Sequence, residues 1–334
     1  MRRAVAILGV STLLCCAGAG ALLGWSLRAP SSEPREVVFE VPPGATLSLV
    51  ARELADAGVI RSAPSFELLA RFRGRAGGLR AGEYALSPSL SADEVLTRLA
   101  LGAVITHRVV LPEGLSAREV AARLDAAGLA TASEFLAVAL DPALPAVFGV
   151  DAATLEGYLF PETYELAKGL SPREIVRLMV EQFLRVWRPL APLARDSGLT
   201  MRQVVVLASL VEKETGAHEE RPLVAAVFLN RLARGMRLET DPAVIYGIAD
   251  FDGNLRRVHL EDEGNPYNTY LFAGLPPGPI ANPGEASLRA VVQPADADYL
   301  FFVARRDGTH QFSRSYAEHV RAVDRYQRNG GAGR

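Results

Sequence analysis

The first pattern along the chain is an apolar stretch, residues 4–27, that contains no charged side chain. As a helix it would be about 35 Å long, and the hydrocarbon core of a bilayer is about 30 Å thick. Arg2 and Arg3 precede the stretch, and such residues favour the cytoplasmic side. We therefore expect residues 1–28 to form a transmembrane anchor, followed by a linker at 29–35 and an exported remainder.

A cleaved signal peptide is the alternative interpretation of this stretch, because Ala17-Gly18-Ala19 resembles a small-residue cleavage site. The apolar run continues past this site to Leu27, which is long for the core of a signal peptide and favours a retained anchor. A lipoprotein is less favoured, because Leu14 is larger than the residue that usually precedes a lipidated cysteine.

Two segments that lie 70 positions apart share one pattern of apolar and polar residues. In each, a predicted strand leads through a Pro-x-Gly turn, at 42–44 or 112–114, into a predicted helix. Thr46 and Ser116 are the expected caps of the two helices, and a glycine follows each helix. Phe66 and Phe135 stand at near-equivalent places beyond. The pattern predicts an internal structural repeat.

Residues 36–105 are predicted to form a compact α+β module around the first copy of this repeat. A loop rich in Gly and Arg, at 73–82, leads to a short strand at 83–86, and Ser91 is the expected cap of a further helix. Small modules of this kind resemble LysM carbohydrate-binding domains. A spacer that holds the next domain off the membrane is an equally good interpretation.

Residues 106–330 are predicted to form a larger mixed α/β domain into which the second copy of the repeat merges. Helices are expected at 171–188, 200–215 and 222–234, and mostly loop at 236–294, with a short helix after Asp241-Pro242. An Asp307-Gly308 turn between two apolar runs predicts a hairpin near the C-terminus, followed by a final helix.

The helix at 200–215 carries the clearest candidate for chemistry. Thr200 and Gln203 have the spacing of a capping box, and Gly216 is expected to end the helix. Positions three, four and seven before Glu214 are all apolar, which places Glu214 at the end of a stripe that faces the core. Burial and the negative end of the helix dipole both raise the pKa of a carboxyl group.

A Glu that stays protonated near neutral pH is suited to act as a general acid. The alternative is a partly buried structural carboxylate that forms an ion pair with Arg221 or Arg231. The stiff, Pro-rich stretch at 274–284, with Tyr and Asn side chains before it, suits a sugar-binding cleft. An ordinary irregular surface loop is the alternative for this stretch.

Composition excludes several classes of function. The 36 Lys and Arg residues balance 38 Asp and Glu residues, which argues against a nucleic-acid partner. The two cysteines, Cys15 and Cys16, both lie in the first apolar stretch, and the five histidines are scattered. His218 and Glu219 begin like a zincin motif, but the second histidine is absent. We expect neither a metal site nor a cofactor.

Several motifs, in order along the chain, resemble those of the YceG-like endolytic murein transglycosylase family. The resemblance covers nearly the whole chain. It rests on the stretches Glu156-Gly157-Tyr158-Leu159-Phe160-Pro161-Glu162-Thr163-Tyr164, Val211-Glu212-Lys213-Glu214-Thr215, Phe228-Leu229-Asn230-Arg231-Leu232, Gly235-Met236-Arg237-Leu238, Thr240-Asp241-Pro242-Ala243-Val244-Ile245-Tyr246-Gly247, Tyr267-Asn268-Thr269-Tyr270 and Gly274-Leu275-Pro276-Pro277-Gly278.

The resemblance implies an enzyme of the inner membrane whose catalytic domain lies on the extracytoplasmic side. It would cut the bond between N-acetylmuramic acid and N-acetylglucosamine in nascent peptidoglycan, near the synthases, and leave 1,6-anhydro ends without consuming water. The catalytic Glu of the family falls on Glu214, as general acid and then base. Tyr267 and Asn268 are the next candidates, as substrate positioners or stabilisers of positive charge. Asn230 and Asp241 are further substrate-binding candidates that could equally be structural.

Two other functions remain open at the level of sequence. A peptidoglycan-binding scaffold without catalysis is the first, although the intact Glu214 argues against it. A muramidase-type hydrolase is the second, and it would need another carboxylate, for which Glu156 or Asp241 would have to fold close to Glu214. We expect no second carboxylate about 5–9.5 Å across the cleft, which is the range that two-carboxylate glycosidases use.

Overall fold

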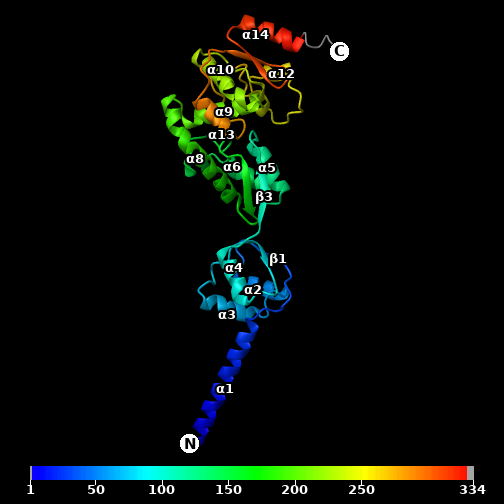
Figure 1. Ribbon diagram of the computed structural model, residues 1–334, viewed down its shortest axis with the longest axis vertical. Helices are drawn as coiled ribbons and strands as arrows, with labels where there is room; N and C mark the ends of the chain where they lie inside the picture. The colour runs from blue at the N-terminus through cyan, green and yellow to red at the C-terminus, as the bar shows by residue number, and fades with distance from the viewer. Residues whose placement is uncertain (1, 329–334) are drawn as a thin grey trace. The chain divides into compact units, whose positions relative to one another are not determined.

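The computed structural model describes residues 2–328, with side chains from residue 13 onward, so part of the predicted anchor lies outside the described side chains. The chain folds into two compact units (Figure 1). Unit 1 comprises Met1–Arg108 and Glu165–Leu170, and unit 2 comprises Val109–Tyr164 and Ser171–Arg334. The predicted mixed α+β composition is confirmed, with three small two-stranded sheets in the described part of the chain. The predicted domain boundaries stay predictions.

Unit 1 is built on an antiparallel pair of strands covered by helices. Its elements are α1 (Arg2–Ser26), β1 (Val37–Val41), α2 (Leu47–Asp56), α3 (Ala63–Phe72), β2 (Gly82–Leu86) and α4 (Ala92–Leu101). Strand β1 pairs with β2 so that Val37 lies opposite Leu86 and Val41 opposite Gly82. The core contains the fully buried side chains of Leu54, Phe66, Tyr84 and Leu96.

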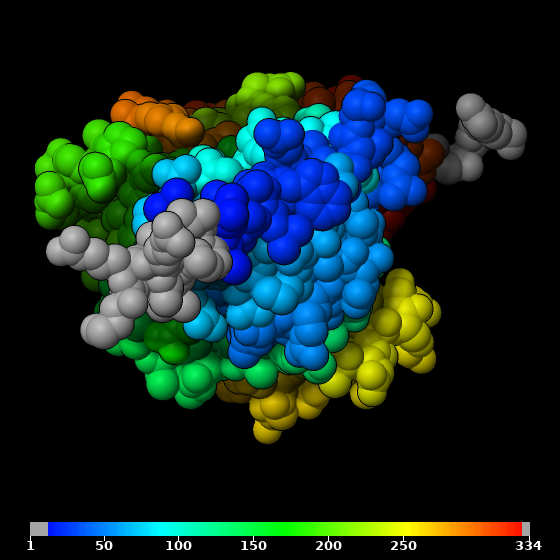
Figure 2. All heavy atoms as spheres, turned by 90° about the horizontal axis from the view of Figure 1, so that it is seen from below, coloured from blue at the N-terminus to red at the C-terminus, as the bar shows by residue number. Residues whose placement is uncertain are grey.

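The segment predicted to be an anchor is helical, as α1. In the part of the chain that the structure describes, no helix combines the length and the apolar character that crossing a membrane requires. The C-terminal end of α1 is tied to α3, because the Ser26 hydroxyl donates to that of Ser65 at 2.8 Å. Figure 2 shows the surface of unit 1 from this N-terminal end, with the residues that follow α1 in blue.

The predicted internal repeat is confirmed. Strand β1 with helices α2 and α3 has its counterpart in β3 (Thr106–Leu111), α5 (Ala117–Ala126) and α6 (Ala132–Ala139), and a strand closes each copy, β2 in the first and β4 (Glu162–Ala167) in the second. The hydroxyls of Thr46 and Ser116 cap α2 and α5. Phe66 and Phe135 are both fully buried. The chain thus contains the β-α-α-β arrangement twice.

Helices form most of the remainder of unit 2. They are α7 (Leu144–Val147), α8 (Pro172–Asp196), α9 (Met201–Glu214), the short 3₁₀ helix η1 (His218–Glu220), α10 (Arg221–Ala233), α11 (Asp241–Tyr246), α12 (Arg257–Leu260) and α13 (Glu285–Val292). Helix α13 packs against α9, α10 and α8. The sequence analysis did not predict α13, because the surrounding residues have the composition of a loop. Its Leu288 and Val291 are buried.

Helix α8 also differs from the prediction, which ended it at residue 188. It continues through Pro189 and Pro192 to Asp196. Leu190 and Ala194 are buried on its inner face, and this packing outweighs the hydrogen bonds that the prolines remove.

The predicted C-terminal hairpin is confirmed. Strands β5 (Phe301–Ala304) and β6 (His310–Ser313) pair antiparallel, with Ala304 opposite His310. Gly308 has a φ of 85°, which an Asp-Gly turn requires. Helix α14 (Tyr316–Val323) follows and ends in one π-helical turn, η2 (Asp324–Arg328).

Candidate functional site

Helix α9 holds Glu214 at the position that the sequence pattern predicts. The predicted capping box is present at its start, where the Thr200 hydroxyl accepts a hydrogen bond from the Gln203 N–H and the Gln203 side chain accepts one from the Thr200 N–H. The apolar stripe before Glu214 is almost fully buried; it consists of Leu207, Leu210 and Val211. The packed stripe fixes the last turn of the helix and therefore the carboxyl group of Glu214.

The end of this helix differs from the prediction. We expected Gly216 to terminate α9, but the helix stops at Glu214 and Thr215 is already extended, with a φ of −137°. The buried Thr215 hydroxyl accepts a hydrogen bond of 3.0 Å from the Ala217 N–H, which turns the backbone away before Gly216 is reached. Gly216 does not have a positive φ.

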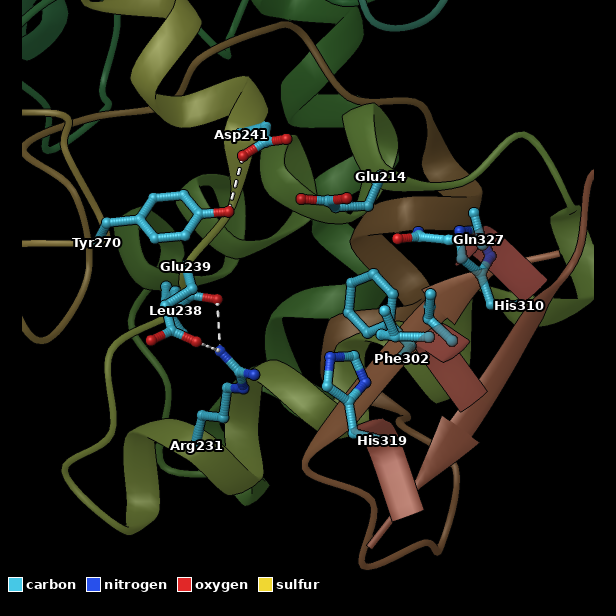
Figure 3. Close-up of a pocket in the computed structure, with 13 residues that line it drawn as sticks. Glu214, Arg231, Leu238, Glu239, Asp241, Tyr270, Phe302, His310, His319 and Gln327 are labelled. Atoms are coloured by element: carbon cyan, nitrogen blue, oxygen red, sulfur yellow. Dashed lines mark hydrogen bonds and ion pairs between the residues drawn. The ribbon is translucent and has the colours of Figure 1, made fainter. Parts of the chain in front are cut away.

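Glu214 lines a cavity of about 430 Å³ within unit 2 (Figure 3). Side chains from α9, α10, the loop before α11, the C-terminal hairpin and α14 meet there, and most of them are polar. The lining residues are Glu214, Arg231, Leu238, Glu239, Asp241, Tyr270, Phe302, Val303, Ala304, His310, His319, Val323 and Gln327. Such a volume falls in the range of sites for small ligands or single sugar rings.

The surroundings of Glu214 raise the pKa of its carboxyl group toward neutral pH. Burial, with a smaller contribution from the negative charge of Asp241, raises the pKa of its carboxyl group to about 6. The nearby Thr240 hydroxyl and the positive charges of His310 and Arg231 act in the opposite direction. Burial dominates, which agrees with the expectation from the apolar stripe.

Asp241 stands beside Glu214 in the same cavity. The Tyr270 hydroxyl donates a hydrogen bond of 2.7 Å to its Oδ1 (Figure 3). Glu239 also lines the cavity. Two further carboxylates thus share the cavity with Glu214, and the expectation that neither is spaced like the pair of a two-carboxylate glycosidase stays a prediction. Glu156, the other carboxylate considered, does not line it.

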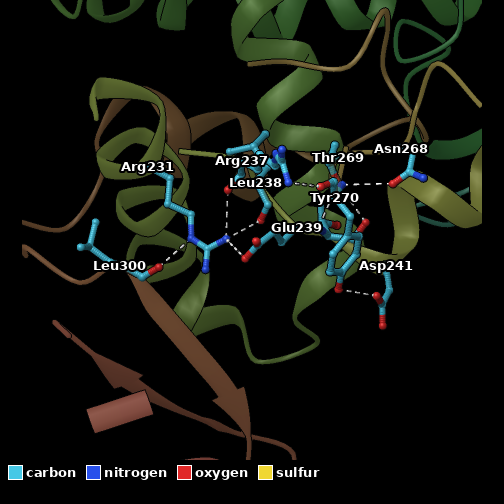
Figure 4. Close-up of polar contacts among 10 residues, drawn as sticks. Arg231, Arg237, Leu238, Glu239, Asp241, Asn268, Thr269, Tyr270 and Leu300 are labelled. Atoms are coloured by element: carbon cyan, nitrogen blue, oxygen red, sulfur yellow. Dashed lines mark hydrogen bonds and ion pairs between the residues drawn. The ribbon is translucent and has the colours of Figure 1, made fainter. Parts of the chain in front are cut away.

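Arg231 balances part of this negative charge (Figure 4). Its guanidinium lies 3.1 Å from the Glu239 carboxylate and donates to the backbone carbonyls of Leu300, Arg237 and Leu238 at 2.7 to 3.1 Å. Arg231 is buried, so these carbonyls hold its orientation. The arginine joins α10 to the segment before α11 and to the start of the hairpin.

The backbone before α11 has an unusual conformation at the cavity. Glu239 has a φ of 54°, a left-handed value that side chains other than glycine rarely adopt. Hydrogen bonds to Thr269 hold this stretch, from the Glu239 N–H to its carbonyl at 3.1 Å and from the Thr240 N–H to its hydroxyl at 3.0 Å. The conformation points the Glu239 side chain toward Arg231 (Figure 4).

The other proposed substrate-binding residues, Tyr267, Asn268 and Asn230, are not among the residues that line the cavity. The Asn268 amide donates to three backbone carbonyls, those of residues 259, 260 and 262. The Asn230 amide donates to the carbonyls of Ala297 and Tyr299. Tyr267 packs edge-on against Tyr246. These contacts shape loops around the cavity, and a direct role of the three residues in binding stays a prediction.

The alternative of an ion pair between Glu214 and a neighbouring arginine has no counterpart among the observed contacts. Arg221 is buried, and its guanidinium lies 2.9 Å from Glu212 and 3.4 Å from Glu113. Glu212 also accepts a hydrogen bond of 3.0 Å from the Gly284 N–H. Glu212 and Arg221 thus form the structural ion pair of this region. Glu214 lines the cavity instead.

Glu156 and the Pro-rich stretch form a second buried region beside α9. Both carboxylate oxygens of Glu156 accept hydrogen bonds of 3.0 Å from the Ala117 N–H, at the start of α5, and the Tyr246 hydroxyl donates at 3.1 Å. Asn282 is buried and donates to the Leu115 carbonyl. The Ile280 N–H donates to the Ser209 hydroxyl of α9 at 3.1 Å. The stretch 280–284 is packed inside and supports α9.

Sequence reasoning missed most of the far side of the cavity. His310, His319 and Gln327 come from the C-terminal hairpin and the helix after it, about 100 residues beyond Glu214. The sequence showed that His310 lies on a strand but gave no reason to bring that strand to α9. In the described residues, no cluster of three or more His, Cys, Asp or Glu side chains is arranged to hold a metal ion.

The chain is similar to known proteins over most of its length. The model of the YceG-like family matches residues 39–325. A Bacillus subtilis protein named endolytic murein transglycosylase is 30% identical over 327 residues, which cover 92% of this chain and 90% of that protein. A Streptococcus pneumoniae protein of the same name is 26% identical, and the match covers 88% of this chain but 59% of that longer protein.

A solved structure has the same fold. The crystal structure of a YceG-like protein from Listeria monocytogenes superimposes with a TM-score of 0.60 and 30% sequence identity, over 86% of this chain and 99% of that one.

Proposed function

The chain belongs to the YceG-like family, and we propose that it is a lytic transglycosylase that cuts peptidoglycan strands, with Glu214 as its catalytic acid and base. The observation that carries this proposal is a half-buried carboxyl group in a polar cavity whose surroundings raise its pKa to about 6. The name of the Bacillus subtilis relative, which matches over nearly its full length, supports the same activity.

In the first step, protonated Glu214 gives its proton to the oxygen between N-acetylmuramic acid and N-acetylglucosamine. The bond from C1 to this oxygen breaks, and its electron pair stays on the departing N-acetylglucosamine. Positive charge develops at C1 of the muramic acid. A carboxyl group with a pKa near 6 is protonated in an adequate fraction at neutral pH and is still acidic enough to transfer the proton.

In the second step, the Glu214 carboxylate acts as a base. It accepts the proton of the C6 hydroxyl while O6 bonds to C1, which forms the 1,6-anhydro ring and restores the protonated Glu214. No water enters the product. We assign the stabilisation of the positive charge at C1 to Asp241, whose carboxylate shares the cavity and accepts a hydrogen bond from the Tyr270 hydroxyl.

We also propose that residues 1–28 anchor the enzyme in the inner membrane, with both units on the extracytoplasmic side, near the synthases that supply nascent strands. The uncharged stretch at 4–27 supports this, together with the large apolar side chains that α1 exposes, Leu13, Leu14, Leu22 and Trp25. Unit 1 would then be the LysM-like module next to the membrane.

One observation favours a second candidate function, a hydrolase of the muramidase type. Asp241 and Glu214 line one cavity, and a pair of carboxylates is what such hydrolases use. The products distinguish the two reactions, because a hydrolase adds water to the cleaved end and a transglycosylase does not.

The test is mass spectrometry of purified, uncrosslinked glycan strands after incubation with the full-length protein in detergent or with its Glu214→Gln variant. The proposal expects products lighter by one water than hydrolysis products, and none with the variant. Glu318→Gln, an exposed acidic residue at the start of α14, is the matched control and should retain activity. Hydrated reducing ends would instead support the hydrolase.

A further inference from the structure

A buried carboxylate holds a histidine of the hairpin that lines the same cavity as Glu214. His310 Nδ1 lies 2.7 Å from Glu220 Oε2, and the His310 backbone N–H donates to Glu220 Oε1 at 2.9 Å. Both side chains are about 10% exposed. Phe302 packs edge-on against the imidazole, with ring centroids 5.4 Å apart. The ring is therefore fixed in both position and plane.

The other edge of this imidazole belongs to the cavity. His310 lines it together with Glu214 (Figure 3). With Nδ1 committed to Glu220, Nε2 is the nitrogen left for the cavity, and no described residue forms a hydrogen bond with it. The pair also joins two distant parts of the chain, since Glu220 follows Glu214 by six residues and His310 comes from β6.

Charges of both signs face Glu214 from the surrounding elements. Asp241 and Glu239 are negative and lie in the segment that leads into α11, with Tyr270 beside Asp241. Arg231 of α10 is positive but is paired with Glu239. The remaining groups that can carry positive charge are His310 and, from α14, His319, whose pKa is lowered by burial. Apart from the paired Arg231, His310 is thus the group of the cavity whose positive charge lowers the pKa of Glu214.

We propose that Glu220 and His310 are positioning residues, in which Glu220 holds the His310 imidazolium so that its charge stabilises the Glu214 carboxylate whenever Glu214 has given up its proton. The inference rests on the proposed function of Glu214. No proton passes between His310 and Glu214 in this proposal, so the proton balance of the two steps is unchanged.

The Glu220–His310 pair would offset the negative charge that appears in the cavity when Glu214 loses its proton. When Glu214 transfers its proton, a third negative charge appears beside Asp241 and Glu239, in a place where burial weakens solvation. The positive charge of His310 lowers the pKa of Glu214 and so opposes the effects of burial and of Asp241. Without this charge Glu214 would be a weaker acid.

The test compares the pH dependence of anhydro-product formation by the full-length protein and by His310→Gln and Glu220→Gln. Activity requires protonated Glu214, so it falls as the pH rises through the Glu214 pKa. Removal of the positive charge raises this pKa. We therefore expect the descending limb of the profile to move to higher pH in both variants. At a pH below that limb, kcat should fall about tenfold, with KM nearly unchanged.

The double variant should be no slower than the slower single variant, because the two residues act through one contact. His107→Gln is the matched control. It removes a similar His–carboxylate pair of unit 1, in which His107 Nε2 lies 2.6 Å from Glu83 Oε2. This substitution should leave the pH profile unchanged. Thermal unfolding and strand binding establish that each variant is folded. If His310→Gln does not fold, Glu220→Gln provides the same test, because the imidazole remains in place.

A wild-type profile in the folded variants would overturn the role of the pair and leave the proposed function intact. The role of the pair would also be overturned if the loss of kcat in the double variant equalled the combined losses of the two single variants. Hydrated products from the wild-type protein, by contrast, would count against the proposed function itself.

Discussion

The hydroxyl of Tyr270 donates a hydrogen bond of 2.7 Å to the carboxylate of Asp241. This contact fixes a second carboxylate in the cavity of Glu214, and its negative charge is one of the causes that raise the Glu214 pKa. The two carboxyl groups of the cavity therefore have different environments, because Glu214 is half-buried with a raised pKa and Asp241 accepts a hydrogen bond from a phenol. A difference of this kind suits two carboxyl groups to different roles in one site.

Replacement of Asp241 by Asn should change the pH profile in the direction opposite to that expected for His310→Gln. Removal of the negative charge lowers the pKa of Glu214, so Glu214 loses its proton at a lower pH. We expect the descending limb of activity to move to lower pH, with a loss of kcat of about tenfold or more if Asp241 also stabilises charge at C1. Initial rates of product formation between pH 4 and 9 measure both effects.

Tyr270→Phe is the matched control for this substitution, because it removes the hydrogen bond and leaves the charge of Asp241. The limb should then move much less than in Asp241→Asn. Equal profiles for the wild type and Asp241→Asn, with both proteins folded, would show that Asp241 does not act on Glu214.

The buried ion pair of Arg221 and Glu212 should matter for stability. Replacement of Arg221 by Met leaves the Glu212 carboxylate, whose side chain is 5% exposed, without its cation. We expect the free energy of unfolding to fall by about 3–5 kcal/mol, because an unpaired buried charge is costly. Urea unfolding at pH 7 measures this change.

The double variant Arg221→Met with Glu212→Gln controls for the unpaired charge. It should recover a large part of the loss, since no charge is then left buried. If the single variant lost less than about 1 kcal/mol, the pair would not be the structural element described here.

Glu156 should make the stability of the fold depend on pH. Burial raises the pKa of this carboxyl group from 4.5 to about 7 in the folded protein, so between these values the folded state binds more protons than the unfolded state. The free energy of unfolding should therefore fall as the pH rises from about 4.5 to 7, by about 3 kcal/mol at most, and then level off. Chemical unfolding at a series of pH values measures the slope.

Glu156→Gln isolates this contribution from that of Glu214, which titrates in an overlapping range. The difference in stability between the wild type and this variant should change with pH over the stated interval. A constant difference would mean that folding does not shift the pKa of Glu156.

Local signals in the sequence predicted the elements that depend on neighbouring residues. The cap at Thr200 and the apolar stripe before Glu214 specified α9 and the burial of its last residue. Likewise, Pro-x-Gly turns and caps predicted the repeated strand–helix unit. These features rest on contacts between residues a few positions apart, which periodicity records.

Local sequence patterns could not predict the contacts between segments that lie far apart in the chain. Glu220 and His310 are 90 positions apart, and no local pattern indicates that they meet. The loop composition of 236–294 also gave no sign of α13 or of the packed interior position of Ile280 and Asn282. In the same way, α8 passes through two prolines because tertiary packing decides its length.

Cleavage in ¹⁸O-labelled water is the most direct test of the central claim, that Glu214 catalyses strand cleavage in which O6 of the sugar and not water attacks C1. Strands are incubated with the wild-type protein and with Glu214→Gln, and the masses of the products are measured by mass spectrometry. We expect 1,6-anhydro ends without ¹⁸O from the wild type and intact strands from the variant. One ¹⁸O atom in each new reducing end, or anhydro ends from the variant, would contradict it.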